Sequence, residues 1–340
     1  MTQPFYALPA ERIAQEPPVV RGQSRLLVVD RRTGELVDRK YGDLLDYLRP
    51  GDVLVLNDTK VLPARLIAKL PDGRARELML TERHGEVLPD GQAVIVYRGK
   101  LRSGNTLHIG QDLVRVLEVR DGGQALVQSD RPFEELAELY GATPLPPYIH
   151  RAATQADRER YQTVFAASTG SVAAPTASLN LTEALLSKIK HRGVRIEHLT
   201  LHVGRGTFLP IRSDKLADHA MHEEYFEIPL DTVRAIRRAK ETGGRVVAIG
   251  TTVTRALEYA VHELLGDIEE SVAGEADIFI YPGYDFQLVD MLLTNFHAPD
   301  STVIQLAAAF AGKDTLKLAY THALDGEYRF LSYGDSMLIV

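Results

Sequence analysis

Hydrophobic and polar residues follow two different patterns along the chain. From about Arg76 to Gln128, apolar and polar residues alternate in short runs such as AVIVYR and VRVLEV, separated by turn sequences such as PDG and DGG. Short alternating runs at this spacing predict a small antiparallel barrel or sandwich. The proline-rich sequence TPLPPYIHR closes this section.

Beyond Asp157 the pattern changes to strands that alternate with helices. VVAIG is followed by TTVTRALEYAVHELLG, whose apolar residues recur at helical spacing, and DIFIYPG and DMLLTNF are two further predicted strands. In PDSTVIQLAAAFAG, Asp300 or Ser301 is a suitable N-cap. This alternation predicts a layered α/β domain with a largely parallel sheet. The apolar run VLVLN near the N-terminus reads as another buried strand, so the β-rich section interrupts, or sits beside, an α/β domain built from both ends of the chain.

Composition narrows the class of protein without identifying it. The 340 residues are 45% hydrophobic and 25% charged, which is typical of a soluble globular protein. The sequence contains no cysteine, which excludes disulfides, thiolate nucleophiles and cysteine-based metal sites. A net charge of −7 argues against a general nucleic-acid binder, although it leaves room for a local basic face. The N-terminus does not resemble a signal peptide and no apolar run is long enough to span a bilayer, so we expect a cytoplasmic protein that does not contact membranes.

Polar residues follow five of the predicted strands. Ligands of open α/β sheets bind at the carboxyl ends of strands, so these residues are candidates for a site, although each cluster also suits turns and helix caps. The clusters are Asn57–Asp58–Thr59, Gly204 to Thr207, Thr251–Thr252, the sequence YPGYDF, and Thr294–Asn295–Phe296–His297.

Familiar ligand motifs are absent or incomplete. VGRG lacks the third glycine of a dinucleotide-binding fingerprint, and no P-loop sequence is present. HAMHEE, from His219 to Glu224, is the best metal candidate, but it precedes a predicted strand, where this spacing puts its histidines on opposite faces. His202, His222 and His297 suit proton transfer equally well, or they hydrogen-bond to buried carbonyl groups.

A series of long motifs, in order from about Tyr6 to Ile339, resembles the S-adenosylmethionine:tRNA ribosyltransferase-isomerase family of queuosine biosynthesis. The matching sequences include LRPGDVLVLNDTKVLPARL, PLPPYIHR, GSVAAPTA, TLHVGRGTF, HAMHEEYFEIP, AIGTTVTRALE, FIYPGYDF, LLTNFHAPDST and EYRFLSYGDSMLI. The resemblance implies an α/β catalytic domain, residues 1–65 and 153–340, with an inserted β-barrel domain, residues 66–152. It also implies transfer and isomerisation of the ribosyl part of S-adenosylmethionine onto 7-aminomethyl-7-deazaguanine at the tRNA wobble position. The products that the resemblance implies are epoxyqueuosine-tRNA, adenine and methionine.

The resemblance suggests roles for residues of these motifs. We expect His222 with Glu223, His202 and His297 to move protons, and Thr251, Thr252 and Arg255 to bind the methionine carboxylate or an RNA phosphate. Phe296 and Tyr284 are expected to stack on adenine or on the target base. Substrate-binding roles are also assigned to Asn57, Asp58, Arg65, Asn180 and Asn295. S-adenosylmethionine is a co-substrate, no cofactor or metal is needed, and a monomer is expected.

One motif departs from the family pattern. In the family GSVAAPTA continues as GLHFT, whereas this chain reads SLNLT, with Ser178, Asn180 and Leu181 at the positions that differ. Asn180 is able to cap the following helix but not to take up a proton near neutral pH. Three other interpretations therefore stay open: a divergent paralogue with altered substrate or lost activity, a nucleoside-binding protein, and a metal-dependent hydrolase that uses HAMHEE.

Overall fold

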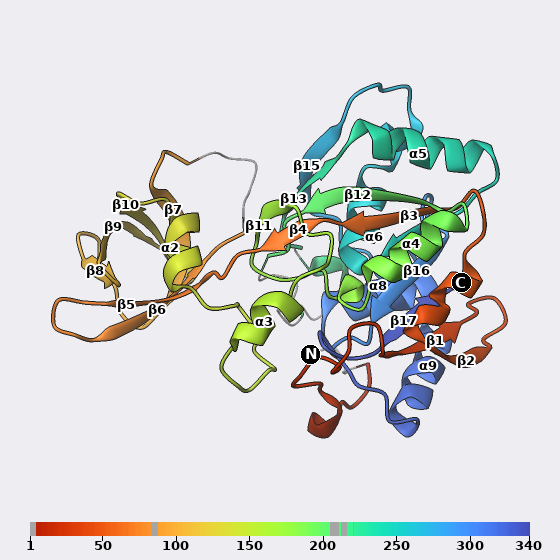
Figure 1. Ribbon diagram of the computed structural model, residues 1–340, viewed down its shortest axis with the longest axis horizontal. Helices are drawn as coiled ribbons and strands as arrows, with labels where there is room; N and C mark the ends of the chain where they lie inside the picture. The colour runs from red at the N-terminus through yellow and green to blue at the C-terminus, as the bar shows by residue number, and fades with distance from the viewer. Residues whose placement is uncertain (1–4, 83–87, 205–210, 212–215, 220) are drawn as a thin grey trace.

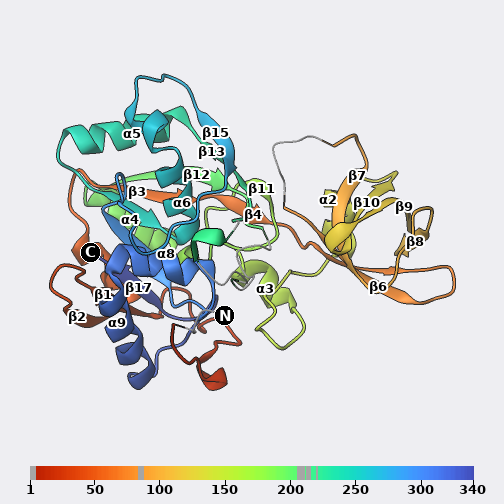
Figure 2. The ribbon, with the colours of Figure 1, turned by 180° about the vertical axis from the view of Figure 1, so that it is seen from behind.

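A large α/β body and a small barrel beside it make up the computed structural model, which describes residues 5–82, 88–204, 211, 216–219 and 221–340. Figure 1 shows the barrel standing at one end of the molecule, away from the main sheet, and Figure 2 shows the same separation from behind. Extended segments connect the two bodies.

The main sheet of the described residues has nine strands in the order β15-β13-β12-β3-β14-β16-β17-β1-β2. The strands are β15 (Val272–Ala276), β13 (Glu224–Ile228), β12 (Arg195–Leu201), β3 (Val53–Asn57), β14 (Val246–Ile249), β16 (Met291–Asn295), β17 (Ser336–Ile339), β1 (Arg25–Val29) and β2 (Leu36–Lys40). The central strands β12, β3, β14 and β16 are mutually parallel, and antiparallel pairs lie toward both edges. The prediction of an α/β domain with parallel strands is confirmed, and the edges make the sheet mixed.

Helices cover both faces of this sheet. Along β3, Val53 and Val55 belong to a core that includes α5 (Leu230–Glu241), α6 (Thr251–Tyr259), α8 (Thr302–Ala311) and α9 (Lys313–Asp325). Leu54 and Leu56 point to the other core, which includes α1 (Leu44–Tyr47) and α4 (Glu183–His191). A strand that is buried on both faces needs apolar residues at every position, which is why VLVL does not alternate.

The barrel is closed and antiparallel, with the strand order β10-β7-β6-β5-β8-β9. Its strands are β5 (Arg65–Lys69), β6 (Ala75–Leu80), β7 (Gln92–Arg98), β8 (Thr106–Ile109), β9 (Asp112–Arg120) and β10 (Gln124–Ser129), and α2 (Phe133–Tyr140) follows them. The chain leaves the α/β body after β4 (Thr59–Val61) and returns through α3 (Gln155–Arg160) to β11 (Ser168–Ser171), which pairs with β4. The barrel is therefore inserted into the α/β body, as predicted.

Two local predictions were wrong. DIFIYPG was predicted as a strand, but the edge strand β15 comes before it, and residues 277–283 form no regular strand although Ile280 is buried in the core. Three apolar residues in a row mark burial without fixing backbone conformation. The cap of α4 is Thr182, whose side chain accepts a hydrogen bond from the Leu185 amide at 3.1 Å, rather than Asn180. Of the two predicted N-cap candidates, Asp300 and Ser301, it is Ser301 that caps α8.

α7 (Val261–Leu265) continues the helical segment after α6. Among the described residues, no helix is long and apolar enough to cross a membrane.

Candidate functional site

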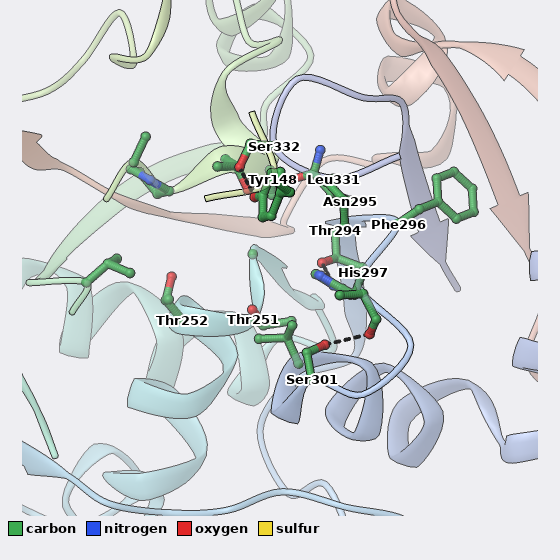
Figure 3. A pocket seen from close by; sticks show the side chains of 18 of the residues that line it. Tyr148, Thr251, Thr252, Thr294, Asn295, Phe296, His297, Ser301, Leu331 and Ser332 are labelled. Atoms are coloured by element: carbon green, nitrogen blue, oxygen red, sulfur yellow. Dashed lines mark hydrogen bonds between the residues drawn. The ribbon is translucent and has the colours of Figure 1, made fainter. Parts of the chain in front are cut away.

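A cavity of about 230 Å³ lies where β14 and β16 end at their carboxyl termini. Figure 3 shows that the beginning of α6, the segment after β16 and the loop around Ser332 face one another across it. The described lining residues are Tyr148, residues 174–177, Val203, residues 250–252, residues 294–298, Asp300, Ser301, Val303, Leu331 and Ser332. The polar residues that the sequence places after β14 and β16 are among those that line this cavity.

The turn from β14 into α6 presents backbone and hydroxyl groups to the cavity. Gly250 has a φ of 104°, a left-handed conformation that favours glycine and lets the chain reverse directly into the helix. Thr251 and Thr252 follow as the first helical residues and are each 7% exposed. The first amide N–H groups of a helix have no acceptor within it, so this edge of the cavity suits an anionic or carbonyl group of a ligand.

At the end of β16, Thr294 and His297 form a hydrogen-bonded pair inside the cavity. Thr294 Oγ1 and His297 Nε2 lie 2.7 Å apart, and the amide of His297 donates to the hydroxyl of Tyr320 at 2.8 Å. Burial lowers the pKa of His297 to about 3, so the imidazole is neutral at pH 7. A neutral imidazole is able both to donate and to accept a hydrogen bond, which suits recognition of a nucleobase edge.

Phe296 lies between these two residues in the motif but points the other way. Its side chain is fully buried, with ring centroids 5.0 Å from Phe330 and 5.4 Å from Tyr320. Figure 3 shows the ring directed away from the other labelled side chains. In this structure the ring packs among aromatic residues of the core, and its stacking on a ligand stays a prediction.

Asn295 ties the cavity wall to the GSVAAPTA segment. Its side-chain oxygen accepts a hydrogen bond from Thr176 Oγ1 at 3.0 Å, and its side-chain nitrogen donates to the carbonyl of Asp335 at 3.4 Å. Asn295 is 2% exposed, so its side-chain amide mainly holds the GSVAAPTA segment in place and offers little surface to a ligand. Residues 174–177 of that loop line the cavity.

The positions of this motif that depart from the family pattern do not line the cavity. Ser178 and Leu181 are fully buried, Asn180 is 4% exposed, and none of the three lines the cavity. Leu181 packs in the core beneath α4, next to Leu185 and Ile189. The motif thus changes from cavity wall to core at about residue 178, and Asn180, a predicted substrate-binding residue, does not line the cavity.

Tyr148 and Ser332 close the opposite wall, and neither was among the predicted site residues. Their hydroxyl groups lie 2.6 Å apart, which joins the segment that returns from the barrel to the C-terminal loop. Both residues lie in motifs of the sequence, PLPPYIHR and EYRFLSYGDSMLI, so the signal was present. It was missed because neither residue follows a strand of the predicted sheet.

His202 belongs to a buried network behind the cavity rather than to its lining. Its Nδ1 lies 2.9 Å from Thr59 Oγ1, which also contacts Ser171 Oγ at 2.8 Å. The imidazole packs so closely on Gly170 that a Cβ there would lie 2.7 Å from the ring. Gly170 therefore has to be glycine for this packing, and His202 is 3% exposed.

Asn57 and Asp58 hold strands together outside the cavity. The side chain of Asn57 donates to the carbonyl of Leu201 at 2.9 Å and accepts from the amide of Leu201 at 3.0 Å. Asp58 accepts a hydrogen bond from Thr200 Oγ1 at 2.7 Å. Both act on the junction of β3 and β12, as strand-end residues often do.

Arg255 is used within the fold. Its guanidinium forms an ion pair with Glu224, and the two side chains are 4% and 2% exposed. It also donates to the carbonyls of Ala276 at 2.9 Å and Ile278 at 3.2 Å. Arg255 is not among the residues that line the cavity, and its role in binding a carboxylate or phosphate stays a prediction.

The HAMHEE segment contributes no side chain to the described cavity. His222 and Glu223 are exposed, and Glu224 is committed to Arg255 and to the amide of Gly204. His219 packs edge-on against Phe279. Within the described part of the chain, no three histidine or acidic side chains are placed to hold a metal ion. Residues 205–207 of the predicted strand end lie outside the described residues.

Tyr284 and Arg65 lie at other places. The hydroxyl of Tyr284 donates to Glu258 Oε2 at 3.2 Å, and the residue does not line the cavity. Arg65 lines a second cleft, between the barrel and the returning segment 144–147. Of the predicted site residues, Thr251, Thr252, Asn295, Phe296 and His297 therefore come together at the first cavity, with Phe296 contributing no ring face.

The cavity lining carries little charge, and more of its surface is apolar than polar. Among its described residues, Asp300 is the sole carboxylate and there is no lysine or arginine. A ligand there meets hydroxyl groups, amides and a neutral imidazole, together with apolar surface from Ala174, Val203 and Leu331. Such a surface suits a small, polar organic molecule with a flat apolar part.

Known proteins resemble the chain over nearly its whole length. Residues 2–339 match the family model described as queuosine biosynthesis protein. The S-adenosylmethionine:tRNA ribosyltransferase-isomerase of Chlorobaculum parvum is 55% identical over 98% of both chains, and that of Halothermothrix orenii is 48% identical over 98% of both. The crystal structure of S-adenosylmethionine tRNA ribosyltransferase from Thermotoga maritima is 35% identical, covers 98% of this chain and 99% of its own, and superposes with a TM-score of 0.57.

Proposed function

Because the chain belongs to the queuosine biosynthesis protein family, we propose that it is an S-adenosylmethionine:tRNA ribosyltransferase-isomerase. It transfers the ribosyl part of S-adenosylmethionine to 7-aminomethyl-7-deazaguanine at the tRNA wobble position and isomerises it. Epoxyqueuosine-tRNA, adenine and methionine leave. S-adenosylmethionine is consumed as a co-substrate, and the proposal needs no separate cofactor.

The cavity at the ends of β14 and β16 is the proposed site of S-adenosylmethionine. The observation that supports it most directly is the convergence of three motifs on one cavity, namely residues 174–177, 250–252 and 294–298. The start of α6, with Thr251 and Thr252, binds the methionine carboxylate through amide and hydroxyl donors. The apolar part of the lining covers the adenine ring.

Among the four residues proposed for proton transfer, His297 is the one that lines this cavity. With a pKa of about 3 it is a weak base, so its proposed role is to hydrogen-bond to the substrate as a neutral group oriented by Thr294. His202, His222 and Glu223 are proposed to act only indirectly, since His202 is enclosed by Thr59 and Gly170 and the other two are exposed outside the cavity.

The inserted barrel is proposed to serve the tRNA rather than the small substrate. Its strands contribute no residue to the described lining of the cavity, whereas Tyr148, from the segment returning from it, does. We propose residues 66–152 as one functional unit and residues 1–65 and 153–340 as the catalytic unit, acting as a monomer in the cytoplasm, where tRNA is modified.

No observation favours a divergent paralogue, because the departing residues Ser178, Asn180 and Leu181 lie outside the cavity.

Release of adenine tests the proposed function. The purified protein is incubated with S-adenosylmethionine and a tRNA that carries 7-aminomethyl-7-deazaguanine, and free adenine and modified tRNA are quantified together. Stoichiometric formation of both supports the proposal, and a tRNA with unmodified guanine at the wobble position is the control. Binding of S-adenosylmethionine without adenine release on the precursor-bearing tRNA would overturn it.

A further inference from the structure

A second cleft lies beside the proposed substrate cavity, at the junction of the barrel and the α/β body. It has a volume of about 160 Å³ and is formed by the outer surface of β5, β6 and β7 and by the proline-rich segment 144–147. Its described lining residues are Arg65, Glu77, Met79, Val96, Tyr97, Arg98, residues 144–147 and Val172. No role in the proposed reaction has been given to this cleft so far.

The two cavities share their dividing wall. Pro147 lines the second cleft and Tyr148, the next residue, lines the first. On the other side, Val172 lines the second cleft and Ala174 lines the first. Adjacent Cα atoms are about 3.8 Å apart, so at Pro147 and Tyr148 the cavities are separated by little more than one chain segment. At the other place a single residue, Ala173, lies between the two lining positions. A polynucleotide whose reacting base reaches S-adenosylmethionine in the first cavity therefore has its neighbouring nucleotide close to the second.

Strand register builds a charged row at this cleft. Arg65 pairs with Met79 and Met79 with Val96, while Glu77 pairs with Arg98, so these side chains share the outer face of the barrel. Glu77 lies between the two arginines, 3.6 Å from Arg65 Nε and 3.7 Å from Arg98 Nη1. Two guanidinium groups share one carboxylate, which leaves an excess positive charge beside an apolar floor of Met79, Val96 and Leu145.

The arginines differ in how they are held. Arg65 is 33% exposed and donates to the carbonyl of Leu145 at 3.3 Å, which fixes it against the returning segment. Arg98 is 79% exposed, so most of its donors face solvent. A fixed guanidinium and a solvated one beside an apolar floor are suited to a phosphate group with its attached ribose and base, because arginine binds phosphate bidentately and also stacks on bases.

We propose that this cleft binds the nucleotide next to the wobble position in the anticodon loop of the tRNA. The inference rests on the proposed function, in which the wobble base has to reach the ribose of S-adenosylmethionine bound in the first cavity. Arg98 contacts the flanking phosphate, Arg65 orders the returning segment and contributes charge, and Met79 and Leu145 cover the ribose and base. The net charge of −7 of the chain makes such a local basic site necessary, because the rest of the surface does not attract RNA on average.

Binding of tRNA to charge variants tests this inference. Arg98→Ala is compared with Arg115→Ala, which changes the net charge of the protein equally. Arg115 lies on β9, whose neighbours in the barrel are β8 and β10 and not the strands β5, β6 and β7 that form the cleft. The probe is the tRNA that carries the precursor base, and its dissociation constant is measured at several salt concentrations without S-adenosylmethionine. Arg98→Ala is expected to weaken binding about tenfold and to lower the slope of log K against log salt by about 0.7, as for one lost phosphate contact.

Glu77→Gln supplies a test of opposite sign. Removal of the carboxylate frees both arginines for the RNA, so tRNA binding is expected to tighten by about threefold or more. Affinity for S-adenosylmethionine alone stays unchanged in all three variants. Equal effects of Arg98→Ala and Arg115→Ala, or weaker tRNA binding by Glu77→Gln, would overturn the assignment.

The inference and the proposed function fail in different ways. The binding measurement needs no turnover, so a wild-type protein that releases no adenine contradicts the function alone. Normal adenine release with Arg98→Ala, at subsaturating tRNA and with unchanged KM for tRNA, contradicts the cleft alone.

Discussion

Thr294 Oγ1 and His297 Nε2 lie 2.7 Å apart at the carboxyl end of β16, and both side chains line the proposed substrate cavity. The three-residue spacing brings the imidazole back onto the threonine as the chain turns toward α8. The hydroxyl fixes the orientation of a ring whose pKa is about 3 and which is therefore uncharged at neutral pH. The pair is arranged for hydrogen bonding rather than for carrying charge.

Variants of this pair separate the two roles. His297→Asn keeps a neutral group that donates and accepts hydrogen bonds, so kcat/KM for S-adenosylmethionine is expected to stay within about threefold of wild type. His297→Ala and Thr294→Val each remove one hydrogen-bonding partner and are expected to lower kcat/KM about tenfold. A loss in His297→Asn as large as in His297→Ala, together with a shifted pH–rate profile, would instead identify His297 as a proton carrier.

The buried histidine also makes stability depend on pH. The pKa of His297 is about 3 in the folded protein, against about 6.5 in an unfolded chain, so between these values the unfolded state binds more protons. The free energy of unfolding therefore falls as pH decreases below 6.5, by up to about 1.4 kcal/mol per pH unit from this group. Urea titrations between pH 4 and 7 should show a smaller dependence in His297→Asn than in wild type. His262→Asn, at an exposed position on α7, is the control and should match wild type.

Arg255 is expected to matter for stability rather than for substrate binding. Arg255→Ala leaves Glu224 buried without its ion-pair partner, which is expected to lower the free energy of unfolding by about 3–5 kcal/mol. Arg234→Ala, which breaks an ion pair with Glu269 at an exposed site, is the control and is expected to cost at most about 1 kcal/mol. Unfolding by urea measures both. An Arg255→Ala protein of normal stability with a KM for S-adenosylmethionine raised tenfold would restore the role that the sequence suggested.

Substitutions at the positions that depart from the family pattern are expected to change the free energy of unfolding more than the catalytic activity. Leu181→Ala removes a fully buried side chain and is expected to cost about 2–5 kcal/mol, and Leu181→Phe is expected to cost about 1–3 kcal/mol through overpacking. Asn180→His places the family residue behind the cavity wall, so adenine release by this variant is expected to stay within about twofold of wild type. A large gain in activity in Asn180→His would show that the family histidine acts on the reaction and that this chain has lost that contribution.

Sequence by itself determined the architecture, because it is encoded in local patterns. Alternating runs between turn sequences specified the barrel strands, unbroken apolar runs such as VLVL specified strands buried on both faces, and Ser301 marked the start of α8. The strand-end rule also placed Thr251, Thr252 and His297 at a common edge of the sheet. These features depend on backbone geometry and on the period of side-chain burial, which neighbouring residues set together.

Tertiary structure alone decided which polar and aromatic side chains reach the cavity. Because they belong to motifs, Phe296, Arg255 and Asn180 were predicted as site residues on the same grounds as His297. In the structure, however, the Phe296 ring packs in the aromatic core and the Arg255 guanidinium pairs with Glu224. Tyr148 and Ser332 entered the site from segments that are 184 residues apart. Where every face of an element is buried, sequence periodicity does not tell which buried direction leads to a cavity, because that depends on how distant segments pack against one another.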